Sequence, residues 1–100
     1  MLIIAGTIRM EKTATEEVLE ACRNMMRATH KEEGCIDYVF SVDPMDSKIL
    51  HVFERWETQE ALDAHFLASH MTPFRKAMTN WGVSDMDILK FDVGNFDQMR

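Results

Sequence analysis

The sequence predicts an α+β domain in which four antiparallel strands form one sheet and the helices cover one of its faces. Segments with an apolar residue at every second position, as in strands, alternate with segments whose apolar residues recur every three or four positions, as in helices. Their order is β-α-β-β-α-(α)-β, that of ferredoxin-like domains. A chain of 100 residues has room for one hydrophobic core. We therefore expect a single domain over residues 1–94 and a C-terminal tail at 95–100.

The spacing of the apolar residues first changes between the N-terminal strand and the first helix. Residues 2–10 alternate with a period of two. Thr15, followed by Glu16 and Glu17, is typical of a helix start, because a hydroxyl caps free N–H groups and acidic side chains favour the first turn. The apolar stripe of this helix consists of Val18, Cys22, Met25, Met26 and Thr29. Gly34 then indicates a left-handed C-cap.

The middle of the chain predicts a hairpin. Residues 35–42 and 49–56 both alternate as strands do. The segment 43–47 between them, Asp-Pro-Met-Asp-Ser, has the residue types of a turn.

Two helices and a strand complete the predicted fold. Thr58 is expected to cap a second helix that runs to about Ser69. A short third helix should open at Thr72-Pro73, with proline at its first position, and end at Gly82. Residues 85–93 form the last predicted strand.

The strands carry apolar residues on both faces, and one layer of helices covers only one of them. A sheet with one face in water should have polar residues at alternate positions. The first strand instead has Leu2 and Ile4 on one side and Ile3 and Ala5 on the other, and Phe53 lies on the outer side of the third strand. A second copy packed sheet to sheet would cover this face. We therefore expect an obligate homodimer through the sheet face.

The charge balance excludes some classes of function. Lys and Arg number 11 against 17 Asp and Glu, and the net charge of −6 disfavours nucleic acid, which needs a basic surface. No apolar stretch approaches the roughly 20 residues of a membrane-spanning helix, and the N-terminal residues lack the basic start of a signal peptide. We expect a cytoplasmic protein in which Cys22 and Cys35 are reduced thiols.

The candidate site residues gather between positions 38 and 70. On the second helix Leu62, His65 and Phe66 share one face, and the two apolar residues indicate that His65 points inward. His70 follows at the helix end, and Glu54 shares its strand face with large apolar side chains. Histidine and glutamate beside apolar walls serve general acid–base catalysis, although a hydrogen-bonded core histidine produces the same pattern.

The other histidines indicate no second site. His51 lies on the outer face of its strand, where we expect a structural role, and His30 near the end of the first helix is expected in solvent. His65 and His70 are five positions apart, which misses the i, i+4 spacing that places two metal ligands together. The chain has no phosphate loop, dinucleotide fingerprint or Gly-x-Ser-x-Gly elbow. We expect neither a metal nor a cofactor.

Five segments, taken in order, resemble one known family. They are Gly34-Cys35-Ile36-Asp37-Tyr38, Asp43-Pro44, Phe53-Glu54-Arg55-Trp56, Glu60-Ala61-Leu62-Asp63-Ala64-His65 and Ser69-His70-Met71. Together they are similar to the antibiotic biosynthesis monooxygenase (ABM) domain. The resemblance covers residues 1–93 and implies a dimeric α+β barrel.

The resemblance implies several activities. The family includes cofactor-free monooxygenases of quinols and polyphenolic polyketides, heme-degrading members, and an isomerase of a phosphorylated sugar derivative. Heme degradation does not fit, because Thr7 stands where those members have Asn, His65 where they have Trp, and Arg75-Lys76 in the region of the proximal His. The isomerase-like members share His65, His70 and Glu54, so that chemistry stays open.

The function that we expect is a cofactor-free monooxygenase that takes a quinol or polyphenolic aromatic substrate and dioxygen. A deprotonated electron-rich phenol can itself reduce dioxygen, so the protein must supply an apolar slot, a base and groups that stabilise the anion. We assign His65 as the base, His70 as a second proton carrier and Glu54 as the group that holds a histidine tautomer. The substrate-binding residues are expected to be Tyr38, Trp56, Phe66 and Leu62. A non-catalytic protein that binds a small aromatic metabolite is the alternative.

Overall fold

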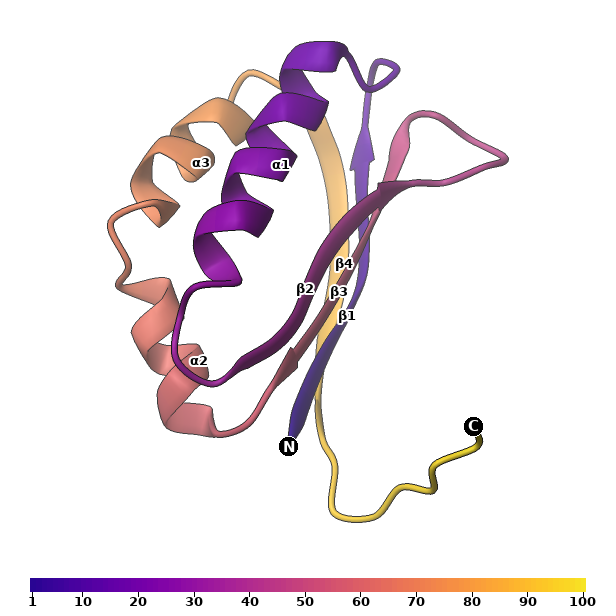
Figure 1. Cartoon of the computed structure of the whole chain (residues 1–100). Helices are drawn as coiled ribbons and strands as arrows, with labels where there is room; N and C mark the ends of the chain where they lie inside the picture. The colour runs from indigo at the N-terminus through magenta and orange to yellow at the C-terminus, as the bar shows by residue number, and fades with distance from the viewer.

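A computed structural model describes residues 1–100 as two layers, a sheet of four strands and a set of helices on one of its faces (Figure 1). The elements are β1 (Leu2–Met10), α1 (Glu16–Thr29), β2 (Cys35–Val42), β3 (Ile49–Trp56), α2 (Gln59–Phe66), α3 (Met71–Met78) and β4 (Val83–Asp92). The strand order is β2-β3-β1-β4, and all neighbours are antiparallel. This confirms the ferredoxin-like fold. No helix combines the length and the apolar character that a membrane span requires.

The predicted caps and the predicted turn are present. The Thr15 hydroxyl accepts a hydrogen bond from the Val18 N–H at 3.3 Å and begins α1. The Thr58 hydroxyl accepts one from the Ala61 N–H at 3.1 Å and begins α2. In the turn between β2 and β3, a carboxylate oxygen of Asp43 accepts hydrogen bonds from the backbone N–H groups of Met45 and Asp46, at 2.8 and 3.0 Å. Local side-chain chemistry therefore sets these boundaries.

The predicted helix ends were less accurate. α1 ends at Thr29, and Gly34 serves the following turn into β2 with a φ of +83°. A side chain there would also meet α2, because an added Cβ would lie 2.5 Å from the Cβ of Ala61. α2 ends at Phe66, three residues before the predicted end.

The third helix also differs from its prediction. α3 begins at Met71, so Pro73 is its third residue rather than its first. Proline fits there because the N–H groups of the first turn have no partner within the helix. α3 ends at Met78, and Gly82, with a φ of +65°, lies directly before β4.

The hydrophobic core lies between the sheet and the helices. On β1 and β3 the even-numbered residues face the helices, and Ile8, Leu50 and Trp56 are fully buried. The methionine and cysteine stripe of α1 belongs to this core through Met25 and Cys22. Burial raises the pKa of the Cys22 thiol to about 11, so this cysteine stays protonated and unreactive at neutral pH.

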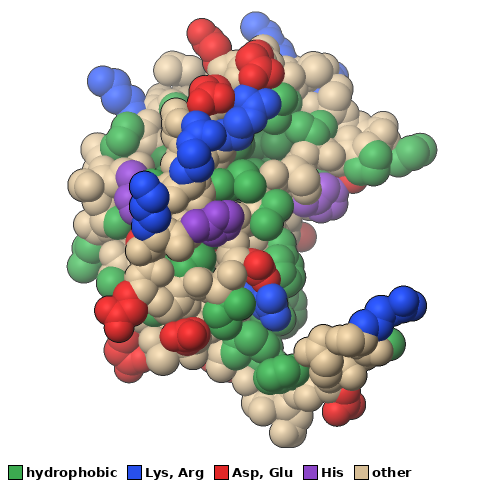
Figure 2. All heavy atoms as spheres, viewed as in Figure 1, with side chains coloured by type: hydrophobic (Ala, Val, Ile, Leu, Met, Phe, Trp, Pro, Cys, Tyr) green, Lys and Arg blue, Asp and Glu red, His purple; other side chains and the backbone are tan.

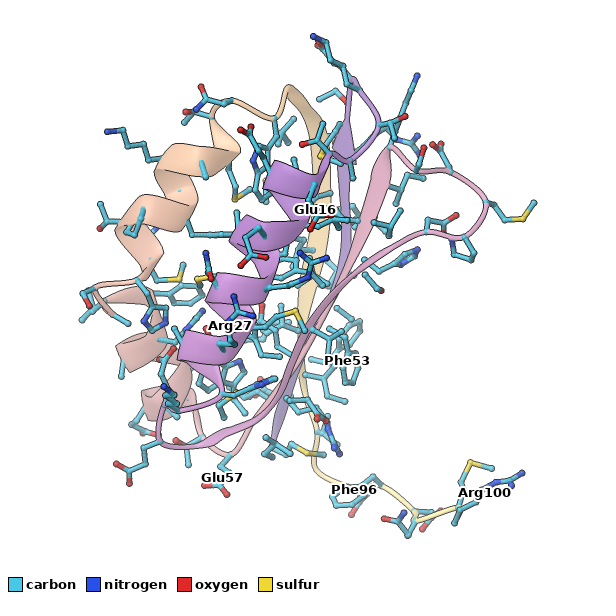
Figure 3. The ribbon with its side chains drawn as sticks, turned by 45° about the horizontal axis from the view of Figure 1, so that its top comes forward. Glu16, Arg27, Phe53, Glu57, Phe96 and Arg100 are labelled. Atoms are coloured by element: carbon cyan, nitrogen blue, oxygen red, sulfur yellow. The ribbon has the colours of Figure 1, made fainter.

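The opposite face of the sheet has no helix over it. Phe53 points away from the helices (Figure 3), and hydrophobic side chains line the side of the molecule turned away from them (Figure 2). We call this the outer face. Its apolar side chains are Ile3, Ala5, Ile49, Val39, Phe53, Leu89 and Phe91, of which the last four are 38–56% exposed.

Candidate functional site

A cavity of about 330 Å³ lies between the sheet and the pair α2–α3. Eleven of its 14 lining residues are hydrophobic, and they come from all four strands and both helices. Its volume is at the lower end of the range for small-molecule sites, about 300–1,000 Å³. The cavity is therefore the candidate site for a small apolar ligand.

Three polar side chains form the inner end of this cavity. Tyr38 on β2 is the register neighbour of Glu54 on β3, and His65 comes from α2 above them. Their residues are only 3%, 8% and 1% exposed. The Tyr38 ring lies 5.2 Å from the His65 ring between centroids. We call this group the polar end. The structure thus brings together three of the site residues predicted from the sequence.

Burial favours the protonated, uncharged forms of Tyr38 and Glu54. Burial raises the pKa of Tyr38 above its usual range, so its hydroxyl remains a hydrogen-bond donor at neutral pH. Burial also raises the pKa of Glu54 to about 7, against the opposing effect of a hydrogen bond from the Trp56 indole N–H at 2.9 Å. Glu54 can therefore give or accept a proton near neutral pH.

The carboxylate that holds the histidines is Glu32, not Glu54. One oxygen of Glu32 lies 2.7 Å from Nδ1 of His65 and 2.8 Å from Nε2 of His70. We had expected Glu54 in this role, but its partner is Trp56. Glu32 lies in the turn after α1, where no periodicity marks a buried acid. Because a carboxylate accepts hydrogen bonds, Nδ1 of His65 carries the proton that it donates to Glu32. In the neutral imidazole, Nε2 is then the basic nitrogen.

Glu32, His65 and His70 also form a set of donor atoms within 4.8 Å of one another, which a divalent metal could use. In this structure the oxygen–nitrogen separations of 2.7 and 2.8 Å are those of hydrogen bonds, so the three residues form a hydrogen-bonded cluster.

Three of the predicted site residues do not line the cavity. Trp56 and Leu62 are 0% and 2% exposed and belong to the core behind it. His70 lies behind Glu32 and lines a different hollow, of about 230 Å³, between α1 and α3. Phe66 does line the cavity and is 48% exposed at its mouth.

The two remaining histidines have partners outside the cavity. Nε2 of His51 lies 2.7 Å from a carboxylate oxygen of Asp43. His30, at the end of α1, is exposed, and its Nε2 lies 2.9 Å from the carbonyl oxygen of Tyr38. Cys35 is partly buried, and its pKa is raised to about 11, mainly by burial. None of these groups contributes to the cavity wall.

The raised pKa of Glu54 predicts a pH dependence of stability. The folded chain keeps this proton up to about pH 7, whereas the unfolded chain releases it near 4.5. Because the native state binds more protons in this window, the free energy of unfolding should fall from pH 4.5 to 7, by at most about 3 kcal/mol. We expect Glu54→Gln to flatten this slope in urea unfolding at fixed protein concentration.

The exposed Glu57 provides the matched control. Glu57→Gln removes the same carboxylate from the same region, and it should leave the slope between pH 4.5 and 7 unchanged. Equal slopes in the two variants would show that Glu54 does not titrate as its burial implies.

Comparison with known proteins identifies relatives. The sequence model of the family described as "Antibiotic biosynthesis monooxygenase" matches residues 1–77. The uncharacterized protein sll1783 of Synechocystis is 29% identical over 73 residues, which are 73% of this chain and 50% of that protein. The uncharacterized protein YjcS of Bacillus subtilis is 33% identical over 61 residues, which are 60% and 57% of the two chains. This chain thus matches about half the length of these relatives.

Solved structures share the fold. A protein of Deinococcus radiodurans, whose name places it in the same family, superposes with a TM-score of 0.85 at 22% identity and covers 100% of this chain and 99% of its own. A similarly named protein of Nitrosomonas europaea superposes with a TM-score of 0.84 at 17% identity, over 93% and 98% of the two chains. At these identities the likeness concerns the fold.

Proposed function

Because the chain belongs to the antibiotic biosynthesis monooxygenase family, we propose that it oxidises a quinol or polyphenolic aromatic substrate with dioxygen and without a bound cofactor. The observation that carries this proposal is the cavity, whose walls are apolar and whose polar end holds Tyr38, Glu54 and His65. An aromatic ring fits between the apolar walls, while its hydroxyl group meets the polar end.

His65 is the base in this proposal. Its Nδ1 bonds to Glu32 at 2.7 Å, so Nε2 carries the free lone pair that takes the phenolic proton. The Glu32 carboxylate then stabilises the positive charge that the ring acquires. Tyr38, whose hydroxyl stays protonated, donates a hydrogen bond to the developing phenolate oxygen.

The substrate supplies the electrons for the reaction. The phenolate passes two electrons to dioxygen, which forms a peroxide on a ring carbon. Loss of the proton on that carbon supplies two further electrons, which break the O–O bond, so that one oxygen stays on the ring as a carbonyl and the other leaves as water. The two protons of that water come from the phenol, through His65, and from the ring carbon that becomes a carbonyl. Substrate and dioxygen thus give a quinone and water, and Glu54 is placed to deliver a proton to the departing oxygen.

One observation favours a second candidate function. Glu54 and His65 line the same cavity, and the pKa of Glu54 is about 7, so the site holds two groups able to carry protons near neutral pH. One could remove a proton from a carbon beside a carbonyl while the other returns a proton elsewhere, as an isomerase requires. This reaction consumes no dioxygen.

We also propose that a second copy of the chain covers the outer face. Four strands about 4.8 Å apart and eight to ten residues long at about 3.4 Å each present about 600 Å² in projection, roughly three quarters of the ~800 Å² per partner of a stable interface. The exposed side chains of Phe53, Leu89 and Phe91 would lose their contact with water in this interface. Neither the cavity mouth nor the polar end is part of this face.

An oxygen electrode tests the proposed function. We expect oxygen uptake with 1,4-dihydroxynaphthalene or anthrone, above the rate of autoxidation, in the presence of EDTA and without added flavin. Thermal-shift measurements with the same compounds accompany the assay. Stabilisation without uptake would favour a binding protein or the isomerase, and the absence of both would contradict the proposal.

A further inference from the structure

Arg75 is the one permanently charged cation on the cavity wall. It lies on α3, is exposed, and shares the lining with a single acidic residue, Glu54. Its Nη2 donates a weak hydrogen bond to the carbonyl oxygen of Phe66 at 3.2 Å. The contact brings the guanidinium next to the end of α2, beside Phe66 of the cavity lining.

Arg75 has no carboxylate partner, although the chain has an excess of acidic residues. Apart from Arg100 in the tail, all the other arginines form ion pairs. These pairs are Arg9 with Asp46, Arg23 with Glu16 and Glu20, Arg27 with Glu20, and Arg55 with Asp37. The guanidinium of Arg75 therefore keeps N–H donors for a ligand, in the fork that matches a carboxylate.

The polar end and Arg75 lie at different depths. Tyr38, Glu54 and His65 are at most 8% exposed, whereas the side chains at the mouth, Phe66 and Met86, are 48% and 50% exposed. A ligand that fills the cavity therefore meets hydroxyl, carboxyl and imidazole groups at its inner end and a cation at its outer end. A carboxylate at the inner end would be buried without a permanent cation beside it, whereas at the mouth it meets Arg75, which fixes the direction of the ligand.

We propose that the ligand of this cavity is a hydroxylated aromatic carboxylic acid, with its phenol at the polar end and its carboxylate on Arg75. The phenol end rests on the proposed function, and the carboxylate end rests on the position and the missing partner of Arg75. A volume of about 330 Å³ equals about eleven water volumes of ~30 Å³. One or two fused rings fit, with the carboxylate projecting at the mouth.

Three naphthols test the proposal by their own fluorescence. 6-Hydroxy-2-naphthoate carries its carboxylate at the far end of the ring from the hydroxyl, 3-hydroxy-2-naphthoate carries it beside the hydroxyl, and 2-naphthol has none. We expect the first to bind about tenfold more tightly than the other two, as one charge-assisted contact at a partly exposed rim provides. Arg75→Gln should abolish this preference and leave the affinity for 2-naphthol within about twofold.

Lys76 gives the matched control. It is the next residue on α3, exposed and outside the cavity lining, so Lys76→Gln removes the same charge without altering the site. We expect the wild-type preference in this variant. Equal binding of all three naphthols, or an equal effect of the two substitutions, would overturn the carboxylate proposal and leave the proposed function standing. If no naphthol binds at millimolar concentration, both proposals are wrong.

Discussion

The His65→Gln variant is expected to lose quinol-dependent oxygen uptake by a factor of about 10²–10⁴, the usual contribution of a positioned general base. The side chain of His65 is 2% exposed, lines the cavity and is oriented by Glu32 at 2.7 Å. Glutamine retains an N–H group for Glu32 but has no basic nitrogen to offer the substrate. The loss should therefore fall on turnover, while binding of 2-naphthol changes little.

Two measurements make this result interpretable. Circular dichroism and the thermal midpoint establish that the variant is folded, because His65 packs against Trp56 with ring centroids 4.9 Å apart. His51→Gln is the control, since His51 bonds to Asp43 and lies on the outer face, away from the cavity. Unchanged oxygen uptake in a folded His65→Gln protein would remove His65 from the mechanism.

The fold was predictable because its signals are local. The alternation in β1 and β3, the caps at Thr15 and Thr58, and the turn at Asp43 each depend on residues within a few positions of one another. The helix ends were predicted less well because a glycine that looks like a helix cap can instead serve a tertiary contact. Gly34 illustrates this, since its close approach to Ala61 is a contact with a helix that follows much later in the chain.

The candidate site was predictable only in part, for the same reason. Periodicity gives the direction of a side chain, and it placed Glu54 on the apolar face of its strand and His65 on the inward face of its helix, where both are buried. It gives no depth, so Trp56 was expected in the cavity although it lies in the core behind it. Glu32 was missed because its partner His65 is 33 positions away.

The Phe53→Asp variant is expected to convert the proposed dimer to a monomer at micromolar concentration. Phe53 lies on β3 in the middle of the outer face, opposite Ala5 of β1 and Val39 of β2. A carboxylate there would lose its hydration without gaining a partner, which costs several kcal/mol per ion, and two copies would carry it. Each 1.4 kcal/mol weakens association tenfold, so dissociation should be complete. Light scattering coupled to gel filtration measures the mass directly.

The control must add the same charge away from the outer face. Met45, in the turn between β2 and β3, is 92% exposed, so Met45→Asp should remain a dimer. Phe53 is itself 40% exposed in the single chain and contributes little to the hydrophobic core. The monomeric variant should therefore keep its far-ultraviolet circular dichroism spectrum. A wild-type monomer at micromolar concentration, or a dimeric Phe53→Asp protein, would contradict the proposed interface. A folded monomer that still binds 2-naphthol would show that each chain holds a complete cavity, as the lining by residues of a single chain predicts.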